Sequence, residues 1–355
     1  MMVRGLATVL GLSAVLVVQE PPPLPGKTTV SAHLLTGHVK GQNLVWCSTF
    51  QLAWDALGQD VCGEPLQLQG SPAMERALNG SGIRKQDLDP ESVFIRAARL
   101  SPGLVDEINT ALKKKFGNQA PQPLQAPVER EGALAYAFLY KNLEFKKPFD
   151  RQREPLPWMG AEGLKAPLQA FGILKVDGQT PPEQSAQIQI LNDRRGAYIL
   201  ELKTLSPKDR LVLAQTEPKA TLKETLDDVR DRVRGSSVPP FAIQVTDQCL
   251  IPCIQVAIDR VYDEIIGREV LNRKLTGHIV REARQNLRFC LDEKGAMLKS
   301  EAKIRIPKNG HAPRQIVFDR PFLLYLERVG AEHPYLAIWF ENSELFLKVD
   351  PAQNK

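Results

Sequence analysis

The chain has 355 residues, of which 43% are hydrophobic and 25% are charged, a composition typical of a globular protein that can bury a core without metal or disulfide support. Its formal net charge is +5, from 46 basic and 41 acidic residues, and the basic runs at 113–115 and 146–147 are short. These values argue against a dedicated nucleic-acid-binding protein, so no nucleic-acid partner is predicted.

The N-terminal residues are typical of a secretory signal. Arg4 supplies a positive charge, and residues 5–18 form an uncharged, mostly apolar run, shorter than the roughly 20 residues needed to cross a bilayer. We predict a signal peptide over residues 1–20, a proline-rich linker over 21–30 and a single domain over 31–355. The protein should then be secreted or extracytoplasmic, without membrane contact after cleavage. Because no small-x-small cleavage site is obvious, a retained N-terminal anchor is the alternative.

The next part of the chain alternates between strand and helix patterns. Residues 43–46 are predicted as a short strand that enters a helix through Ser48 or Thr49 as N-cap, and this helix should reach Leu57. Residues 102–116 have apolar side chains at helical spacing, and Gly117 is expected to end that helix. The other elements expected before residue 150 are a helix over 72–79 and strands over 93–100 and 133–145.

Beyond residue 150 the pattern becomes more strand-like. Residues 197–202 and 211–214 are typical of a hairpin, and Thr221 followed by Glu224 is a capping box that predicts a helix over 221–234. Residues 241–245 are predicted as a strand, and 254–266 as a helix ended by Gly267. Strands and helices alternate irregularly and without a repeat, which favours one α+β domain.

Residues with catalytic or metal-binding chemistry form no recognisable constellation. No nucleophile elbow, phosphate-binding loop, dinucleotide fingerprint or HExxH motif occurs, and the histidines are scattered: His33, His38, His278, His311 and His333. We therefore predict no enzyme, no metal and no cofactor. In an exported chain the cysteines permit one or two disulfides, or they act as small buried apolar residues, and their pairing stays open: Cys47, Cys62, Cys249, Cys253 and Cys290.

The C-terminal part carries the most informative pattern. Residues 296–306 alternate between small or apolar side chains and mostly charged ones, as in a strand with one buried face. Residues 307–313 contain prolines and a glycine, cannot continue a sheet and are expected to be exposed to proteases. Residues 316–318 and 321–326 are again strand-like. The pattern fits either a bait loop between two core strands or a β-hairpin with a long polar loop.

Segments along the chain resemble those of the serpins, in the same order. Residues 291–295 (Leu-Asp-Glu-Lys-Gly) are similar to the end of the strand that leads into the serpin hinge. Residues 318–322 (Phe-Asp-Arg-Pro-Phe) are similar to the signature after the reactive loop. Weaker resemblances are found at residues 43–48, at Tyr140 with residues 145–150, and at 199–202. The resemblance runs from Asn43 to the C-terminus.

This resemblance implies an α+β, serpin-like fold, with mixed β-sheets, surrounding helices and an exposed reactive-type loop near the C-terminus. The scissile bond would join Lys308 and Asn309, with Arg305 as the alternative site, and a basic residue there suits a trypsin-like serine protease. A monomer is expected. The hinge residues would be Glu293, Gly295, Ala296, Leu298, Ser300 and Ala302.

Several features depart from the family pattern. Residues 118–127 form only a short connector where serpins carry a helix across the large sheet, so that helix is expected to be missing. The polar cluster beneath the sheet is expected to be replaced by Cys47, Phe50, Ala137 and Gln285. Leu298 is bulky, and overpacking typically costs about 1–3 kcal/mol, although the alternation of residues 296–306 keeps every charge outside. Two functions remain: a secreted protease inhibitor acting by loop cleavage and insertion, or a non-inhibitory serpin-like binding or structural protein.

Overall fold

The computed structural model describes residues 26–129, 131–161, 163, 165–174, 181–194, 197–295 and 314–349. The predicted signal peptide lies outside these ranges. The linker predicted over residues 21–30 overlaps strand β1 (Thr28–Ser31), so its last residues belong to a sheet instead. Among the described residues, no helix is long and apolar enough to cross a membrane.

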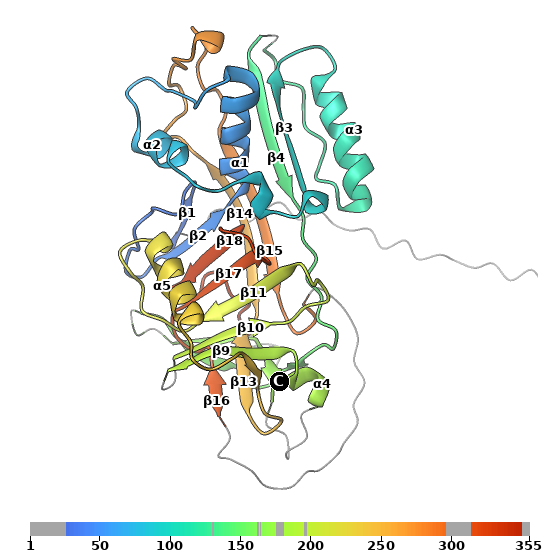
Figure 1. Ribbon diagram of the computed structural model, residues 1–355, viewed down its shortest axis with the longest axis vertical. Coiled ribbons are helices and arrows are strands. Elements are labelled where there is room, and N and C mark those ends of the chain that lie inside the picture. The colour runs from blue at the N-terminus through green and yellow to red at the C-terminus, as the bar shows by residue number, and fades with distance from the viewer. Residues whose placement is uncertain are drawn as a thin grey trace, which may run out of the picture.

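An eight-stranded sheet forms the centre of the fold (Figure 1). Its strands in spatial order are β1, β2 (Asn43–Cys47), β18 (Leu336–Phe340), β17 (Phe322–Arg328), β11 (Asp209–Ala214), β10 (Ala197–Leu202), β9 (Ile188–Arg194) and β12 (Phe241–Ala242). The predicted hairpin is confirmed as β10 paired antiparallel with β11. The central strands are buried on both faces, which explains why they appear in the sequence as continuous apolar runs.

Helix α5 (Leu222–Arg234) covers one face of this sheet (Figure 1). It begins at the predicted capping box: the Glu224 backbone N–H donates to the Thr221 hydroxyl, and the Thr221 N–H donates to the Glu224 carboxylate. Its apolar stripe packs on strands β11, β17 and β18, through Leu222, Leu226 and Val229 against Val212, Tyr325 and Trp339.

The opposite face of the sheet packs against a smaller sheet and an aromatic core. The smaller sheet contains β16 (Gln315–Val317), β13 (Gln248–Pro252), β8 (Ala170–Ile173) and β5 (Asp150–Arg151), and the hairpin of β6 (Leu156–Met159) and β7 (Lys165–Leu168) lies beside it. Phe318 and Phe322 are fully buried, with ring centroids 5.1 Å apart. The segment that resembles the serpin signature therefore closes the core after the loop.

Two strand pairs extend the fold beyond the eight-stranded sheet. β3 (Val93–Arg99) pairs antiparallel with β4 (Ala133–Leu139), and β14 (Ile254–Val261) pairs antiparallel with β15 (Arg284–Leu291). The prediction of a helix over residues 254–266 is wrong. Ile254, Val256 and Ile258 are buried at every second position, and this period of two with β-branched side chains fits a strand.

The helices lie mainly around the strand pairs. The bounds are α1 (Thr49–Ala56), continued by a π-helix over Leu57–Cys62, then α2 (Ala73–Asn79), α3 (Leu104–Phe116) and α4 (Pro182–Ser185), with 3₁₀ turns at Lys85–Asp87, Pro90–Ser92, Gly117–Gln119 and Arg273–Leu275. The helices predicted over 72–79 and 102–116 are confirmed. Ser48 is the N-cap of α1, but its side chain makes no capping hydrogen bond.

All five cysteines are free thiols. Cys47, Cys62, Cys249 and Cys253 are buried, and Cys290 is exposed. The buried four act as small apolar core residues, so the described fold is held together without a disulfide.

Candidate functional site

The predicted hinge begins with a tight turn directly after β15. The Gly295 N–H donates to the Asp292 carbonyl (3.2 Å), and the Lys294 N–H donates to the Asp292 carboxylate (2.9 Å). Asp292 and Gly295 form an antiparallel bridge, and Gly295 has a φ of +74°. Residues 292–295 therefore form a chain-reversing turn directly after β15.

The other side of this turn contacts the chain that continues beyond β4. The Phe149 N–H donates to the Glu293 carbonyl (2.7 Å), and the Phe145 N–H donates to the Lys294 carbonyl (3.2 Å). A Cβ atom added to Gly295 would lie 2.5 Å from the Leu143 carbonyl oxygen and 2.7 Å from the Phe145 nitrogen. Only glycine fits, because both the positive φ and the close backbone exclude a side chain.

An ion pair also holds the turn in place. The Arg151 guanidinium, in β5, lies 2.7 Å from the Glu293 carboxylate and 4.0 Å from Asp292. The Glu293 side chain is only 13% exposed, so this contact is partly shielded from water and from salt. The hinge is thus fixed to the four-stranded sheet as well as to the chain after β4.

β15 leads directly into this hinge and the chain after β4 contacts it, but the two strand pairs form no common ladder. β4 pairs only with β3, and β15 pairs only with β14, so each has one unpaired backbone edge within the described part of the chain. Both pairs also contact α1. An unpaired edge of this kind is a template for an added strand.

Beneath β15, a small buried polar cluster connects this strand to the start of α1. The Gln285 amide donates to the Cys47 carbonyl (3.1 Å) and to the Thr49 hydroxyl (2.8 Å), and its oxygen accepts from the Tyr262 hydroxyl (2.8 Å). Of the four positions expected to replace the family's cluster, Gln285 and the Cys47 carbonyl are joined directly. Phe50 packs on the Tyr262 ring at 4.2 Å, and Ala137 packs as a half-buried apolar residue.

Sequence reasoning missed Thr49 and Tyr262 as members of this cluster. Tyr262 comes directly after β14, and a strand in place of the predicted helix puts it beside Gln285, because β14 and β15 pair up to Val261 and Arg284. The period-two pattern of residues 254–258 is the signal that could have located it.

Removing the Gln285 amide should lower the stability of the fold around β15 without creating a large cavity in the core. Replacing Gln285 with leucine leaves the Tyr262 hydroxyl and the Cys47 carbonyl buried without partners, and we expect a loss of about 1–3 kcal/mol of unfolding free energy. Denaturant unfolding measures this loss. A Gln285→Leu/Tyr262→Phe double variant also removes the Tyr262 hydroxyl, which has lost its partner, and should recover part of the lost unfolding free energy. The absence of any recovery would contradict the hydrogen bond between Tyr262 and Gln285.

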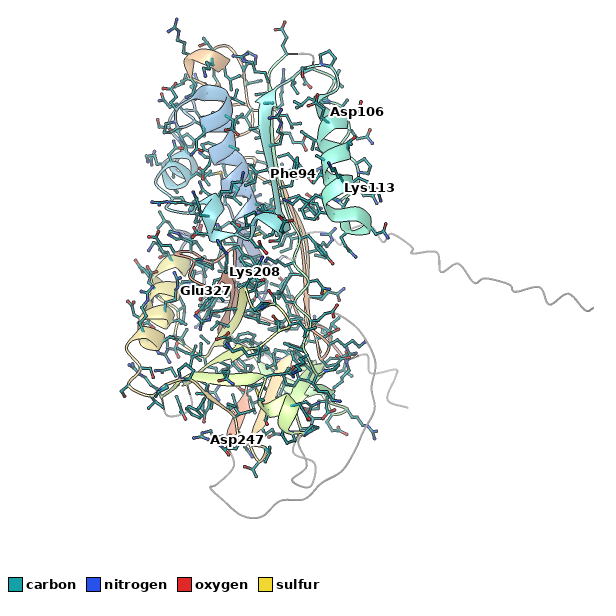
Figure 2. All side chains as sticks on the ribbon, turned by 45° about the vertical axis from the view of Figure 1, so that its right-hand side comes forward. Phe94, Asp106, Lys113, Lys208, Asp247 and Glu327 are labelled. Carbon is teal, nitrogen blue, oxygen red and sulfur yellow. The ribbon has the colours of Figure 1, made fainter. Side chains whose placement is uncertain are left out.

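Helix α3 covers the face of the β3–β4 pair that lies opposite α1. Phe94, labelled in Figure 2 beside this helix, packs with Tyr136 and Phe138 against Leu104, Ile108 and Leu112 of α3. Ala135 and Ala137, at alternate positions of β4, belong to the clusters on the α1 side. α3 therefore covers this face, and the described residues between α3 and β4 contain only the 3₁₀ turn at Gly117–Gln119. Lys115, the last residue of the basic run at 113–115, donates hydrogen bonds from its ammonium group to the Pro90 and Val93 carbonyls.

Only part of the predicted site falls within the described residues. Glu293 and Gly295 are brought together at the hinge. The remaining predicted hinge residues and the predicted cleavage sites lie outside the described ranges: Ala296, Leu298, Ser300, Ala302, Arg305, Lys308 and Asn309. The chain is described again from Arg314, whose backbone N–H donates to the buried Asp247 carboxylate just before β16.

Known structures share this architecture although the sequence has diverged. No protein-family model matches the chain, and no curated protein matches its sequence. It is similar to a thyroxine-binding globulin in complex with thyroxine (TM-score 0.51, 10% identity, 84% of this chain and 92% of that chain). The human thyroxine-binding globulin with its ligand gives a TM-score of 0.50 (10% identity, 85% and 92% covered). Tengpin, a thermophilic serpin in its native state, gives 0.50 (12% identity, 84% and 88% covered). The α+β, serpin-like fold expected from the sequence is confirmed, and the chain is a divergent protein of the serpin fold.

Proposed function

We propose that the protein is a secreted inhibitor of a trypsin-like serine protease. It acts by inserting its reactive loop, once the protease has cut it, as a strand between β4 and β15. The observation that carries this proposal is the hinge turn, which reverses the chain at Gly295 beside two strands with unpaired edges. In this proposal the chain has no active site of its own, and the protease supplies the chemistry.

The energetics of an added strand support insertion. A strand between β4 and β15 could form about ten new backbone hydrogen bonds, each worth about 1 kcal/mol net. The alternation of residues 296–306 lets small or apolar side chains turn inward while the charged ones stay in water, so that no unpaired charge is buried. This gain opposes the about 1–3 kcal/mol expected from overpacking at Leu298 and the about 1–2 kcal/mol per residue of backbone entropy lost when the loop is ordered. The apolar side chains that turn inward must supply the remainder.

A second candidate is a binding protein that keeps the fold without trapping a protease. Two observations favour it: Leu298 would slow the first step of insertion, and one structure similar to this chain is a thyroxine-binding globulin in complex with thyroxine. The two candidates differ in the fate of the protease after it cuts the loop, since only an inhibitor holds its protease.

Incubation of the mature chain with trypsin tests both candidates. For an inhibitor we expect cleavage at Lys308 or Arg305, a covalent complex that survives a denaturing gel, and a melting temperature of the cut chain that is higher by roughly 10 °C. A variant with Lys308→Ala and Arg305→Ala is the control for cleavage at these two sites, and peptide mapping of both proteins locates any cut at Lys299 or Lys303. Cleavage with a raised melting temperature but no complex supports the binding protein. Cleavage with neither change rejects loop insertion.

A further inference from the structure

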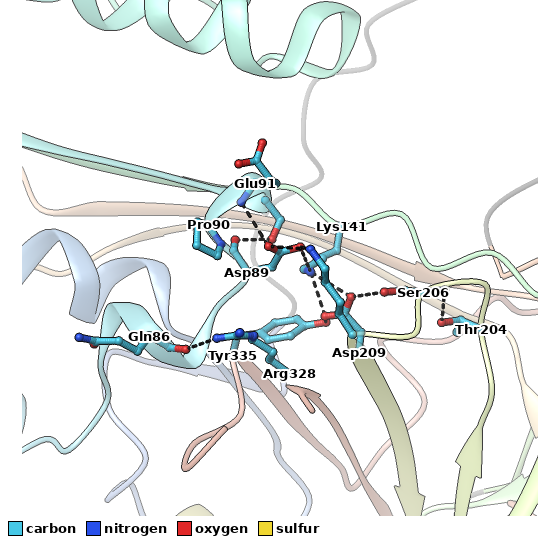
Figure 3. A network of polar contacts seen from close by, with 12 residues as sticks. Gln86, Asp89, Pro90, Glu91, Lys141, Thr204, Ser206, Asp209, Arg328 and Tyr335 are labelled. Carbon is cyan, nitrogen blue, oxygen red and sulfur yellow. Dashed lines mark hydrogen bonds and ion pairs between the residues drawn. The ribbon is translucent and has the colours of Figure 1, made fainter. Parts of the chain in front are cut away.

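Asp209, at the start of β11, accepts contacts from three segments of the chain (Figure 3). The Lys141 ammonium lies 2.9 Å from each carboxylate oxygen, the Tyr335 hydroxyl donates at 3.1 Å, and the Ser206 hydroxyl donates at 2.6 Å. The Asp209 side chain is 3% exposed and that of Lys141 is 11% exposed. This is a buried, fully bonded ion pair rather than a surface contact.

The partners of Asp209 connect two bodies that share no ladder. Lys141 lies just beyond the end of β4, whereas Asp209 and Tyr335 belong to the eight-stranded sheet and the turn before β18. Lys141 also approaches Asp89, which precedes β3, at 4.0 Å, and Lys208 binds the same carboxylate at 3.2 Å. Both strands of the β3–β4 pair are therefore tied to the eight-stranded sheet at the same end.

A second link lies at the same end. The buried Asp87 carboxylate, in the turn before β3, accepts from the Glu332 N–H (3.0 Å) and lies 3.2 Å from His333 Nδ1, and the Arg328 guanidinium donates to the Gln86 carbonyl. The Lys141 ammonium also lies 5.7 Å from the centre of the Tyr335 ring, a distance suited to a cation–π contact. Burial raises the pKa of Tyr335, so its hydroxyl stays protonated and remains a donor to Asp209.

We propose that Lys141, Asp209 and Tyr335 form a latch that holds the β3–β4 pair against the eight-stranded sheet and limits how often that pair moves away. A buried ion pair is a suited latch, because separating its members exposes each to a poorly solvating environment until water enters. If the proposed loop insertion occurs, β4 is one of its two receiving edges, and the latch then also sets the rate of insertion.

The variant must release the latch without leaving a buried charge. Replacing Lys141 alone leaves the Asp209 carboxylate uncompensated, which destabilises any fold. Lys141→Met together with Asp209→Asn removes both charges, while the Ser206 and Tyr335 hydroxyls keep a side-chain oxygen to bond. The matched control is Lys223→Met with Asp227→Asn, an ion pair of 2.6 Å on α5 whose side chains are 46% and 48% exposed.

Hydrogen exchange of the uncut full-length chain decides the proposal. In the latch variant, amides of β3 and β4 should exchange at least about tenfold faster than in the wild type, while those of β9, β10 and β11 keep their rates. The control variant should change neither group. Unchanged exchange in β3 and β4, or an equal acceleration everywhere, would overturn the latch.

A second measurement separates this proposal from the function on which part of it rests. After the loop is cut, the latch variant should reach its raised melting temperature several times faster than the wild type. If neither protein gains stability on cutting, loop insertion is rejected, and the exchange rates of β3 and β4 still decide the latch. If both gain stability at the same rate while β3 and β4 exchange faster, the link between latch and insertion is rejected.

Discussion

A Gly295→Ala substitution is expected to abolish the thermal stabilisation that the proposed loop insertion would give after cleavage. The new Cβ would lie 2.5 Å from the Leu143 carbonyl oxygen and 2.8 Å from the Glu144 Cα, which are backbone atoms that cannot rotate away. The turn must then open, and the carbonyls of Glu293 and Lys294 lose their bonds to the chain after β4. The loop no longer starts beside the unpaired edges.

Gly267→Ala is the matched control for this substitution. Gly267 has a φ of +80°, close to that of Gly295, but a Cβ added there meets no atom within 4 Å. The control should cost only the about 1–2 kcal/mol of the left-handed backbone and leave insertion intact. The melting temperature of each variant before and after cleavage gives the comparison. Equal behaviour of the two variants would mean that the close packing at the hinge has no part in insertion.

A Phe322→Ala substitution is expected to cost about 3–5 kcal/mol of unfolding free energy, the largest effect on stability that we predict. Phe322 is fully buried, and its ring centroid lies 4.8 Å from that of Phe340 and 5.8 Å from that of Trp158. Truncation leaves a cavity between the eight-stranded sheet and the smaller sheet, where rigid aromatic neighbours cannot collapse to fill it.

Denaturant unfolding of the Phe322 variant measures this loss, with Val329→Ala as a control near the end of the same strand. Val329 is 53% exposed, so its truncation should change stability by no more than about 0.5 kcal/mol. A Phe322→Leu variant should fall between the two because it fills part of the cavity. A loss at Phe322 as small as that at Val329 would contradict the role of this residue in closing the core.

The parts of the fold that local signals specify could be predicted from the sequence. The capping box at Thr221 located α5, the apolar spacing and Gly117 located α3, and the segments around Phe322 pointed to the serpin fold. These signals work because caps, glycines and periodic burial depend on neighbours within a few residues.

Features that depend on distant partners could not be predicted. The requirement for glycine at position 295 comes from the backbone of residues 143–145, which lies far away in the sequence. The latch unites Lys141, Asp209 and Tyr335, none of which belongs to a motif. Strand β14, in contrast, carries a local signal, the period-two run of residues 254–258, which the prediction of a helix overlooked and which the pairing with β15 makes plain.

The distribution of the five thiols allows a dye to be attached selectively to Cys290 of the natural chain. Burial raises the pKa of Cys249 and of Cys253 to about 12, so these thiols stay protonated and unreactive near neutral pH. Cys290 is exposed on β15, the strand that leads into the hinge, and its raised pKa calls for mildly alkaline labelling. A single maleimide dye could thus be placed on the natural chain without mutation. A change in the fluorescence of the dye after cleavage would then show whether a strand is added beside β15.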